Sequence, residues 1–284
     1  MIVGARSSLR DAYRAVRRGL RRVKAMRYPV TGTAIREALT GFVVREIVFV
    51  HSSLSACGHV VGGAATAMEA LRSWCGAGTL ALPTHTYCYP DEDGNVPIFD
   101  PTTTQSVLGA ITNFYWQSAG VLRSLHPSHS LAARGPAAAA LIANHEKCYT
   151  PCGTGTPYER LLQWDAGVLM FGATLDSYTL FHTAEDAANV SYLYYPKSYV
   201  LKVATQSGVE DVPMRRQDMT VQRRFGAVDV WLEQKGLLQR RALGRGELLY
   251  IPSAAAAHRA LLDVLKTEPL FLTTAYDDQS PVKH

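Results

Sequence analysis

The feature that most constrains this chain is a regular alternation between short apolar runs and longer stretches with a helical pattern. Apolar runs with the length of buried strands lie at residues 47–50, 79–83, 130–134 and 168–172. Segments rich in good helix formers lie at residues 64–75, 107–117, 136–147 and 180–186. Weaker patterns follow, with strands expected at 198–204 and 248–252 and helices at 228–236 and 255–269. The alternation predicts an α/β sandwich.

Length and composition are those of an enzyme-sized globular protein. The chain has 284 residues, of which 47% are hydrophobic and 19% are charged, so it can bury a large core. We expect one compact domain over residues 28–284. No apolar run approaches the roughly 20 residues that span a bilayer, and the N-terminus lacks the pattern of a signal peptide. These observations predict a cytoplasmic protein.

The cysteines do not form a structural framework. The five are Cys57, Cys75, Cys88, Cys148 and Cys152, which is an odd number without a CxxC pair. This pattern argues against both a set of disulfides and a structural zinc site, and it predicts reduced, buried thiols. A catalytic thiolate at Cys57 remains an alternative.

Positive charge is concentrated in the first 27 residues. This leader holds nine Lys and Arg residues against Asp11 alone, which gives +8 where the whole chain carries +5. Its apolar residues recur at helical spacing, namely Leu9, Tyr13, Val16, Leu20 and Val23. We expect a basic amphipathic helix that docks on the inner face of a membrane, on the body of the protein or on a second copy of the chain. Because no base-reading pattern follows, nucleic acid is not expected as a partner.

A hydroxyl- and glycine-rich segment follows the first expected strand. Residues 50–63 read VHSSLSACGHVVGG, with Ser52 and Ser53 at the strand end and Gly62 and Gly63 before a helix. Backbone N–H groups at such a helix start suit a phosphate or an amide-rich ligand. The segment is neither a P-loop nor a GxGxxG turn, and an ordinary glycine-rich turn explains it equally well.

A second polar cluster, RSLHPSHS, occupies residues 123–130 and holds two histidines close to Ser130. These side chains could be metal ligands, a nucleophile with its base, or members of a hydrogen-bonded loop. The chain has no HExxH motif, although His85 and Glu185 could complete a metal site in space.

The third cluster is LFHTAED at residues 180–186, where His182 and Glu185 stand three positions apart. On a helix these side chains share one face. A carboxylate bonded to one ring nitrogen fixes the tautomer and makes the other nitrogen more basic, as a general base requires. A purely structural histidine is the alternative.

Together these motifs resemble the aminoglycoside 3-N-acetyltransferase family. The resemblance rests on VHSSL, the paired glycines, GTLALPTH, FDP, LGAI, RSLHPSHS, ARGP and LDSYTLFHTAED, in this order and at similar spacing. It covers residues 31–190 densely and the remainder loosely. It implies the three-layer α/β sandwich of the antibiotic N-acetyltransferase fold, here with the basic helix of residues 1–27 added.

The resemblance also implies an activity and a set of site residues. The enzyme would transfer an acyl group from acetyl-CoA or another acyl-CoA to an amine of an amino sugar, without an acyl-enzyme and without a metal. His182 would be the general base and Glu185 its partner. Acyl-CoA would be bound by Ser52, Ser53, Gly62, Gly63, His126 and Ser130. We expect Thr84, His85 and Asp176 to contact the acceptor.

One departure from the family bears on the acceptor. Residues 210–226 read EDVPMRRQDMTVQRRFG, where we would expect acidic residues that bind a polycationic drug. The arginines are Arg215, Arg216, Arg223 and Arg224. Such a group repels an aminoglycoside and attracts phosphate. A solvated surface is one interpretation, and a nucleotide-linked amino sugar as acceptor is the other.

Two further functions compete with acyl transfer. A metal-dependent hydrolase could use His85, His126, His129 and His182 as ligands. A non-catalytic protein could bind a membrane or a partner through residues 1–27.

Overall fold

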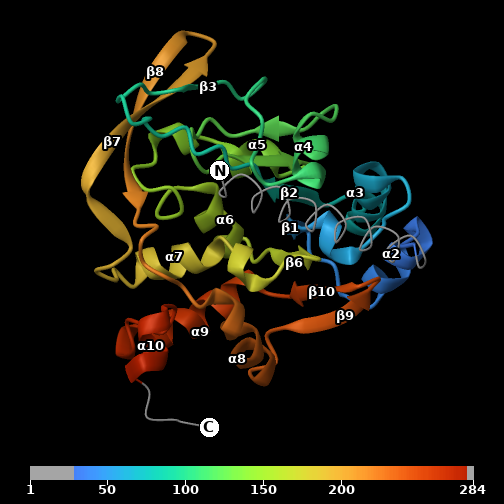
Figure 1. The fold of residues 1–284 in the computed structure, drawn as a ribbon. Helices are drawn as coiled ribbons and strands as arrows, with labels where there is room; N and C mark the ends of the chain where they lie inside the picture. The colour runs from blue at the N-terminus through green and yellow to red at the C-terminus, as the bar shows by residue number, and fades with distance from the viewer. Residues whose placement is uncertain (1–28, 280–284) are drawn as a thin grey trace, which may run out of the picture.

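The computed structural model describes residues 29–279, and the helix expected at residues 1–27 lies outside them. The main sheet consists of β1 (Ile47–Ser52), β2 (Thr79–Pro83), β4 (Leu122–Arg123), β5 (Leu131–Arg134), β6 (Gly167–Phe171), β9 (Gln239–Leu243) and β10 (Gly246–Ile251). Their spatial order is β4-β5-β2-β1-β6-β10-β9. The central strand β1 is parallel to both of its neighbours, β2 and β6, and the outer pairs are antiparallel. The sheet is therefore mixed, with a parallel centre (Figure 1).

Helices cover both faces of the main sheet, which confirms the predicted three-layer α/β sandwich. One face packs against α2 (Gly32–Thr40), α3 (Gly63–Cys75) and α4 (Ala110–Trp116). The other packs against α5 (Ala138–Ile142), α6 (Pro157–Gln163), α7 (Leu180–Ala187), α8 (Val228–Gln234) and α9 (Ala254–Thr267), with α10 (Thr274–Gln279) at the edge. Among the described residues, no helix is long and apolar enough to cross a bilayer.

The continuous apolar runs of the central strands follow from this two-sided burial. On β1, Ile47 and Phe49 pack into the core on the α7–α9 side, and Val48 and Val50 pack into the core on the α3 side. Successive side chains of a strand point to opposite faces, so a strand covered on both faces needs apolar residues at every position. The apolar runs at 47–50, 79–83 and 168–172 therefore coincide with strands.

A second, three-stranded sheet extends away from the main one at the upper left of Figure 1. It contains β3 (Ile98–Phe99), β7 (Tyr194–Thr205) and β8 (Gly208–Gln217) in the order β3-β7-β8. The antiparallel pair β7 and β8 forms a long hairpin. Sequence patterns predicted part of β7 and no strand at β8, because the β8 sequence GVEDVPMRRQ contains no apolar run.

Two predicted helices differ from the expected ranges. The helix expected at 107–117 begins only at Ala110, because Gly109 adopts a φ of 92° that is not helical. The helix expected at 136–147 ends at Ile142, because Ala143 is extended and Asn144 is left-handed. This break turns His145 into the interior, where its ring bonds to Ser124.

Arg123 joins the second sheet and the long 83–109 loop to the main sheet. Its guanidinium donates to the carbonyls of Thr84 (3.0 Å) and Thr104 (2.6 Å). It also lies over the rings of Phe99 and Trp116, with its Cζ atom 4.9 Å and 4.6 Å from their centroids. This one side chain therefore fixes the end of β2, where the chain enters the loop.

Replacing Arg123 with methionine should lower the free energy of unfolding by about 2 to 4 kcal/mol, because the carbonyls of the buried Thr84 and the partly buried Thr104 lose a charged donor. Arg134→Met, at the exposed end of β5, should change it by less than about 0.5 kcal/mol. Urea unfolding at pH 7 measures both values, and equal losses in the two variants would contradict the role given to Arg123.

Candidate active site

A large cavity opens at the carboxyl ends of β1, β2 and β6. It has a volume of about 760 Å³. It is lined by residues at and after the ends of these strands, by residues 107–112, and by His129, Gln217, Met219 and Phe225. The chain leaves β1 for β2 across one face of the sheet and reaches β6 across the other. Such a switch point opens a crevice between the connections, and it is where open α/β sheets bind ligands.

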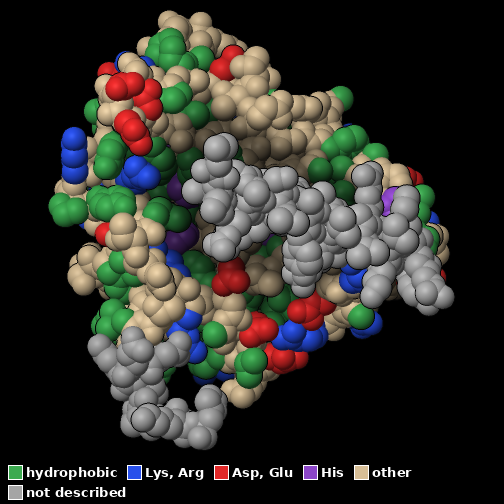
Figure 2. Space-filling model, viewed as in Figure 1, with side chains coloured by type: hydrophobic (Ala, Val, Ile, Leu, Met, Phe, Trp, Pro, Cys, Tyr) green, Lys and Arg blue, Asp and Glu red, His purple; other side chains and the backbone are tan. Residues whose placement is uncertain are grey.

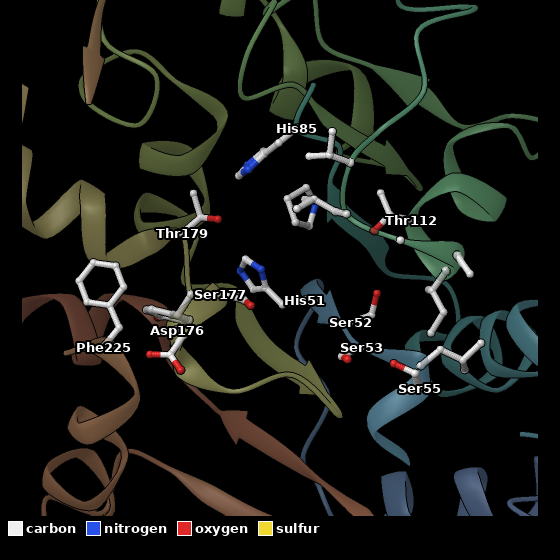
Figure 3. A pocket seen from close by; sticks show the side chains of 18 of the residues that line it. His51, Ser52, Ser53, Ser55, His85, Thr112, Asp176, Ser177, Thr179 and Phe225 are labelled. Atoms are coloured by element: carbon white, nitrogen blue, oxygen red, sulfur yellow. The ribbon is translucent and has the colours of Figure 1, made fainter. Parts of the chain in front are cut away.

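The cavity has two walls of different origin. Figure 3 shows Ser52, Ser53 and Ser55 after β1 on one side, and Asp176, Ser177 and Phe225 on the opposite side. Of the predicted site residues, Ser52, Ser53, His85, Asp176 and His182 line the cavity. The fold thus brings together motifs that are more than 120 positions apart in the sequence.

His182 is held by a buried carboxylate, as the helical spacing predicted. Nδ1 of His182 lies 2.6 Å from Oε2 of Glu185, and the Glu185 side chain is fully buried. Oε1 of Glu185 accepts a hydrogen bond from Nε of Arg223 at 3.2 Å. One carboxylate therefore bridges an imidazole and a guanidinium.

The electrostatics of this triad fix the tautomer of His182. Burial by itself raises the pKa of Glu185, but the hydrogen bond and charge of His182 and the charge of Arg223 outweigh that effect and lower it. An ionised Glu185 can only accept, so Nδ1 of His182 carries the proton. The lone pair of a neutral His182 is then on Nε2, the nitrogen left for the cavity.

Arg223 is a residue that sequence reasoning placed wrongly. Its side chain is 9% exposed, and Nη1 donates to the carbonyls of Asp218 (2.8 Å) and Val221 (3.1 Å). The other three arginines of the 210–226 segment are also partly buried and lie over aromatic rings. The interpretation as a solvated surface is therefore wrong for Arg223. No spacing pattern could reveal Arg223, because it meets Glu185 from 38 positions away.

His85 lines the cavity with a fixed and neutral ring. The Tyr158 hydroxyl donates to the carbonyl of His129 (3.0 Å), so it accepts from Nε2–H of His85 (3.0 Å). Nδ1 of His85 then accepts from the hydroxyl of Tyr87 (3.2 Å). Burial, with smaller effects from neighbouring histidines, holds the pKa of His85 well below its ordinary value. His85 can shape the cavity wall, but it is not a free base.

Three residues that were expected to contact ligands lie behind the cavity wall, where they do not reach the cavity. Thr84, His126 and Ser130 are completely buried. The hydroxyl of Ser130 donates to the carbonyl of Thr84 (2.6 Å), and Nδ1 of His126 accepts from the amide of His129 (3.0 Å). Of the alternatives for RSLHPSHS, the structure supports the hydrogen-bonded polar loop, which positions His129 from behind.

The paired glycines also stand beside the cavity rather than on its surface. Val60 lines the cavity, and Gly62 and Gly63 follow it at the start of α3. Gly62 has a φ of 76°, and a Cβ there would lie 2.2 Å from Oγ1 of Thr66. The helix start therefore requires glycine for steric reasons, which matches the alternative of a glycine-rich turn.

The described residues support neither a catalytic thiolate at Cys57 nor a metal site. All five cysteines are free and buried, as predicted, and burial raises the pKa of Cys57 to about 11, which disfavours a thiolate. No group of three His, Cys, Asp or Glu side chains within residues 29–279 is arranged to hold a metal ion.

Comparisons with known sequences point to one family. A family profile described as aminoglycoside 3-N-acetyltransferase matches residues 49–263. Aminoglycoside N(3)-acetyltransferase IX of Micromonospora chalcea is 35% identical over 180 residues, which are 57% of this chain and 64% of that protein. Aminoglycoside N(3)-acetyltransferase III of Salmonella sp is 36% identical over 177 residues, or 56% and 62%. The matched part of the chain thus spans slightly less than two thirds of either relative.

Solved structures with the same fold extend the similarity over more of the chain. AAC-IIIb in a binary complex with CoASH superposes with a TM-score of 0.75 and 25% identity, covering 87% of this chain and 99% of that one. Aminoglycoside acetyltransferase AAC(3)-Xa gives a TM-score of 0.76 and 26% identity, with coverage of 86% and 95%. A mutant of AAC(3)-IVa has been solved in complex with a gentamicin, and it gives 0.74 and 26%, with coverage of 86% and 92%.

The site region contains an unusual number of buried neutral histidines, and these should govern the acid stability of the protein. They are His51, His85, His126, His129 and His145. Burial lowers the pKa of His51, His129 and His145 to about 3. Below pH 6.5 the unfolded chain takes up protons that the folded protein cannot, so stability is full above that pH and is lost as the pH falls.

Each such histidine should lower the free energy of unfolding by about 1.4 kcal/mol for every pH unit below about 6.5. Urea unfolding between about pH 7.5 and 5.5 measures this slope. His145→Gln should make the slope shallower by the share of one histidine, whatever its effect at neutral pH. A stability that does not change across this range would contradict buried neutral rings.

Proposed function

Because the chain belongs to the aminoglycoside 3-N-acetyltransferase family, we propose that it transfers an acyl group from acyl-CoA to an amine of an amino sugar. Acetyl-CoA is the donor we expect, since AAC-IIIb was solved with CoASH. Residues 28–284 would form the acyltransferase domain. The predicted helix of residues 1–27, with its proposed membrane or dimer contact, lies outside the described residues and stays a prediction.

The observation that carries this proposal is the 2.6 Å contact between His182 Nδ1 and Glu185 at the wall of the cavity. An amine must lose a proton as its nitrogen bonds to the acyl carbon. Nε2 of His182 is the group proposed to take that proton, and the ionised Glu185 stabilises the imidazolium that results. The leaving thiolate of CoA then receives a proton, so the histidine returns to its neutral form.

The acyl carbonyl becomes an oxyanion when the amine attacks, and donors must meet it. The amide of Ser53 already donates to the carbonyl of Phe171 (2.8 Å), so it is not available. We propose the hydroxyl groups of Ser52 and Ser53, which line the wall opposite Asp176, as donors toward the acyl group (Figure 3). The donor would therefore enter along the serine wall and the acceptor along the wall that holds Asp176.

Replacing His182 with alanine should lower kcat by about 10² to 10⁴-fold, because the general base is lost. Release of free thiol from acetyl-CoA in the presence of an amino-sugar acceptor measures the rate. Calorimetry should show that acetyl-CoA binds within about twofold of the wild type. The control is His258→Gln, because His258 lies on α9 outside the cavity lining, and this variant should retain full activity. Near-normal turnover of the alanine variant would remove His182 from the mechanism.

Replacing Arg223 with methionine should shift the pH profile of the enzyme. Arg223 is one of the groups that lower the pKa of Glu185, so its loss raises that pKa. Glu185 then becomes protonated at a higher pH, and the fall of kcat/KM on the acid side should begin at a higher pH than in the wild type. Arg223→Lys keeps the positive charge and should shift the profile less. An unchanged acid limb in the methionine variant would contradict the positioning role of Arg223.

A further inference from the structure

The acceptor wall of the cavity offers little negative charge. Among the described residues that line the cavity, Asp176 is the one carboxylate. Its oxygens already accept hydrogen bonds from the amide of Gly226 (2.7 Å) and the hydroxyl of Thr174 (3.0 Å). A polycationic acceptor would bury several ammonium groups here, and each needs an anionic partner to offset its lost hydration. The cavity lining is therefore poorly suited to such an acceptor.

Positive charge adjoins the same wall. Gln217, at the end of β8, lines the cavity, and Arg215 and Arg216 directly precede it. Figure 2 shows Lys or Arg side chains next to the histidine side chains that are visible in the hollowed face. The local potential at this rim therefore favours anions.

Arg216 is held in place by rings rather than by carboxylates. Its Cζ lies 4.3 Å from the ring centroid of Tyr89, and the rings of Tyr195 and Tyr199 lie at 5.7 Å and 5.9 Å. Tyr89 in turn stacks nearly parallel to Tyr87, with centroids 6.4 Å apart, and Tyr87 lines the cavity. These four tyrosines and Arg216, which we term the tyrosine–arginine platform, lead outward from the cavity.

The charge of Arg216 is not neutralised within the described part of the chain. No Asp or Glu of residues 29–279 forms an ion pair with it, and its buried Nε finds no acceptor among these residues. Two other arginines differ, since Arg223 pairs with Glu185 and Arg240 pairs with three acidic side chains. A guanidinium that is fixed by stacking and has no carboxylate partner is a typical binding group for phosphate.

We propose that the acceptor is an amino sugar that carries a phosphate ester, and that the tyrosine–arginine platform binds this phosphate. The inference rests on the proposed acyltransferase function and concerns only its acceptor. The amine would lie near His182, and the phosphate would lie on Arg216 at the outer end of the platform.

The test compares four acceptors with acetyl-CoA as donor and free thiol as readout. The acceptors are glucosamine, glucosamine 1-phosphate, a uridine-diphosphate-linked amino sugar with a free amine, and kanamycin. The wild type should prefer a phosphate-bearing acceptor over glucosamine by at least about tenfold in kcat/KM, as one charge-assisted contact would give. A preference shared by both phosphate-bearing acceptors indicates that the phosphate is recognised. A preference for the nucleotide-linked acceptor alone indicates that the nucleoside is recognised as well.

Arg216→Gln should lower the ratio of kcat/KM between the phosphate-bearing acceptor and glucosamine by about 10- to 100-fold. Arg216→Lys, which keeps the charge, should restore part of that ratio. Arg240→Gln is the matched control, because Arg240 lies outside the cavity lining and already pairs with acidic residues. The KM for acetyl-CoA should stay within about twofold in all three variants.

Different failures have different meanings. Preferred acylation of kanamycin would overturn the proposal of a phosphate-bearing acceptor, and it would leave the proposed acyltransferase function intact. A rise in the KM for acetyl-CoA in Arg216→Gln, without a change in the acceptor ratio, would also overturn it, because Arg216 would then bind the donor. Thiol release with none of the four acceptors would overturn the proposed function itself.

Discussion

The arrangement of the site depends on one buried carboxylate. Glu185 is fully enclosed and stays ionised because His182 and Arg223 bond to its two oxygens. Without both partners, burial would favour the protonated acid, which could no longer fix the imidazole tautomer. Glu185 and Arg223 together thus fix the ring of His182, so that Nε2 is the nitrogen left for the cavity.

The main sheet supplies the rigidity that this arrangement needs. Strand β1 is buried on both faces, and its end at Ser52 sets one wall of the cavity. Strand β6 pairs with it in parallel and leads to Asp176 and Ser177 in the opposite wall, and then to His182 on α7. Both walls therefore rest on neighbouring strands of one sheet. Behind them, Ser128 of the polar loop holds the ring of His129, and Tyr158 holds the ring of His85.

The second sheet contributes to the cavity and to its surroundings. Its strand β8 contributes Gln217 to the cavity and carries Arg215 and Arg216 at the rim. The arginines contact tyrosine rings, so their charge is held in position without being cancelled. In the proposed function, this sheet would therefore contact the acceptor, and the proposed general base His182 would act from α7.

The sequence by itself determined the central strands, most of the helices and the pairing of His182 with Glu185. Apolar runs specify strands that are buried on both faces, and a separation of three positions on a helix is a local relation. Only the tertiary structure decided that Arg223 completes the triad, that His126 and Ser130 lie behind the wall, and that Arg216 stacks on tyrosines. These contacts join residues that are distant in the chain, and hydrophobic periodicity carries no information about which polar side chains meet across separate elements.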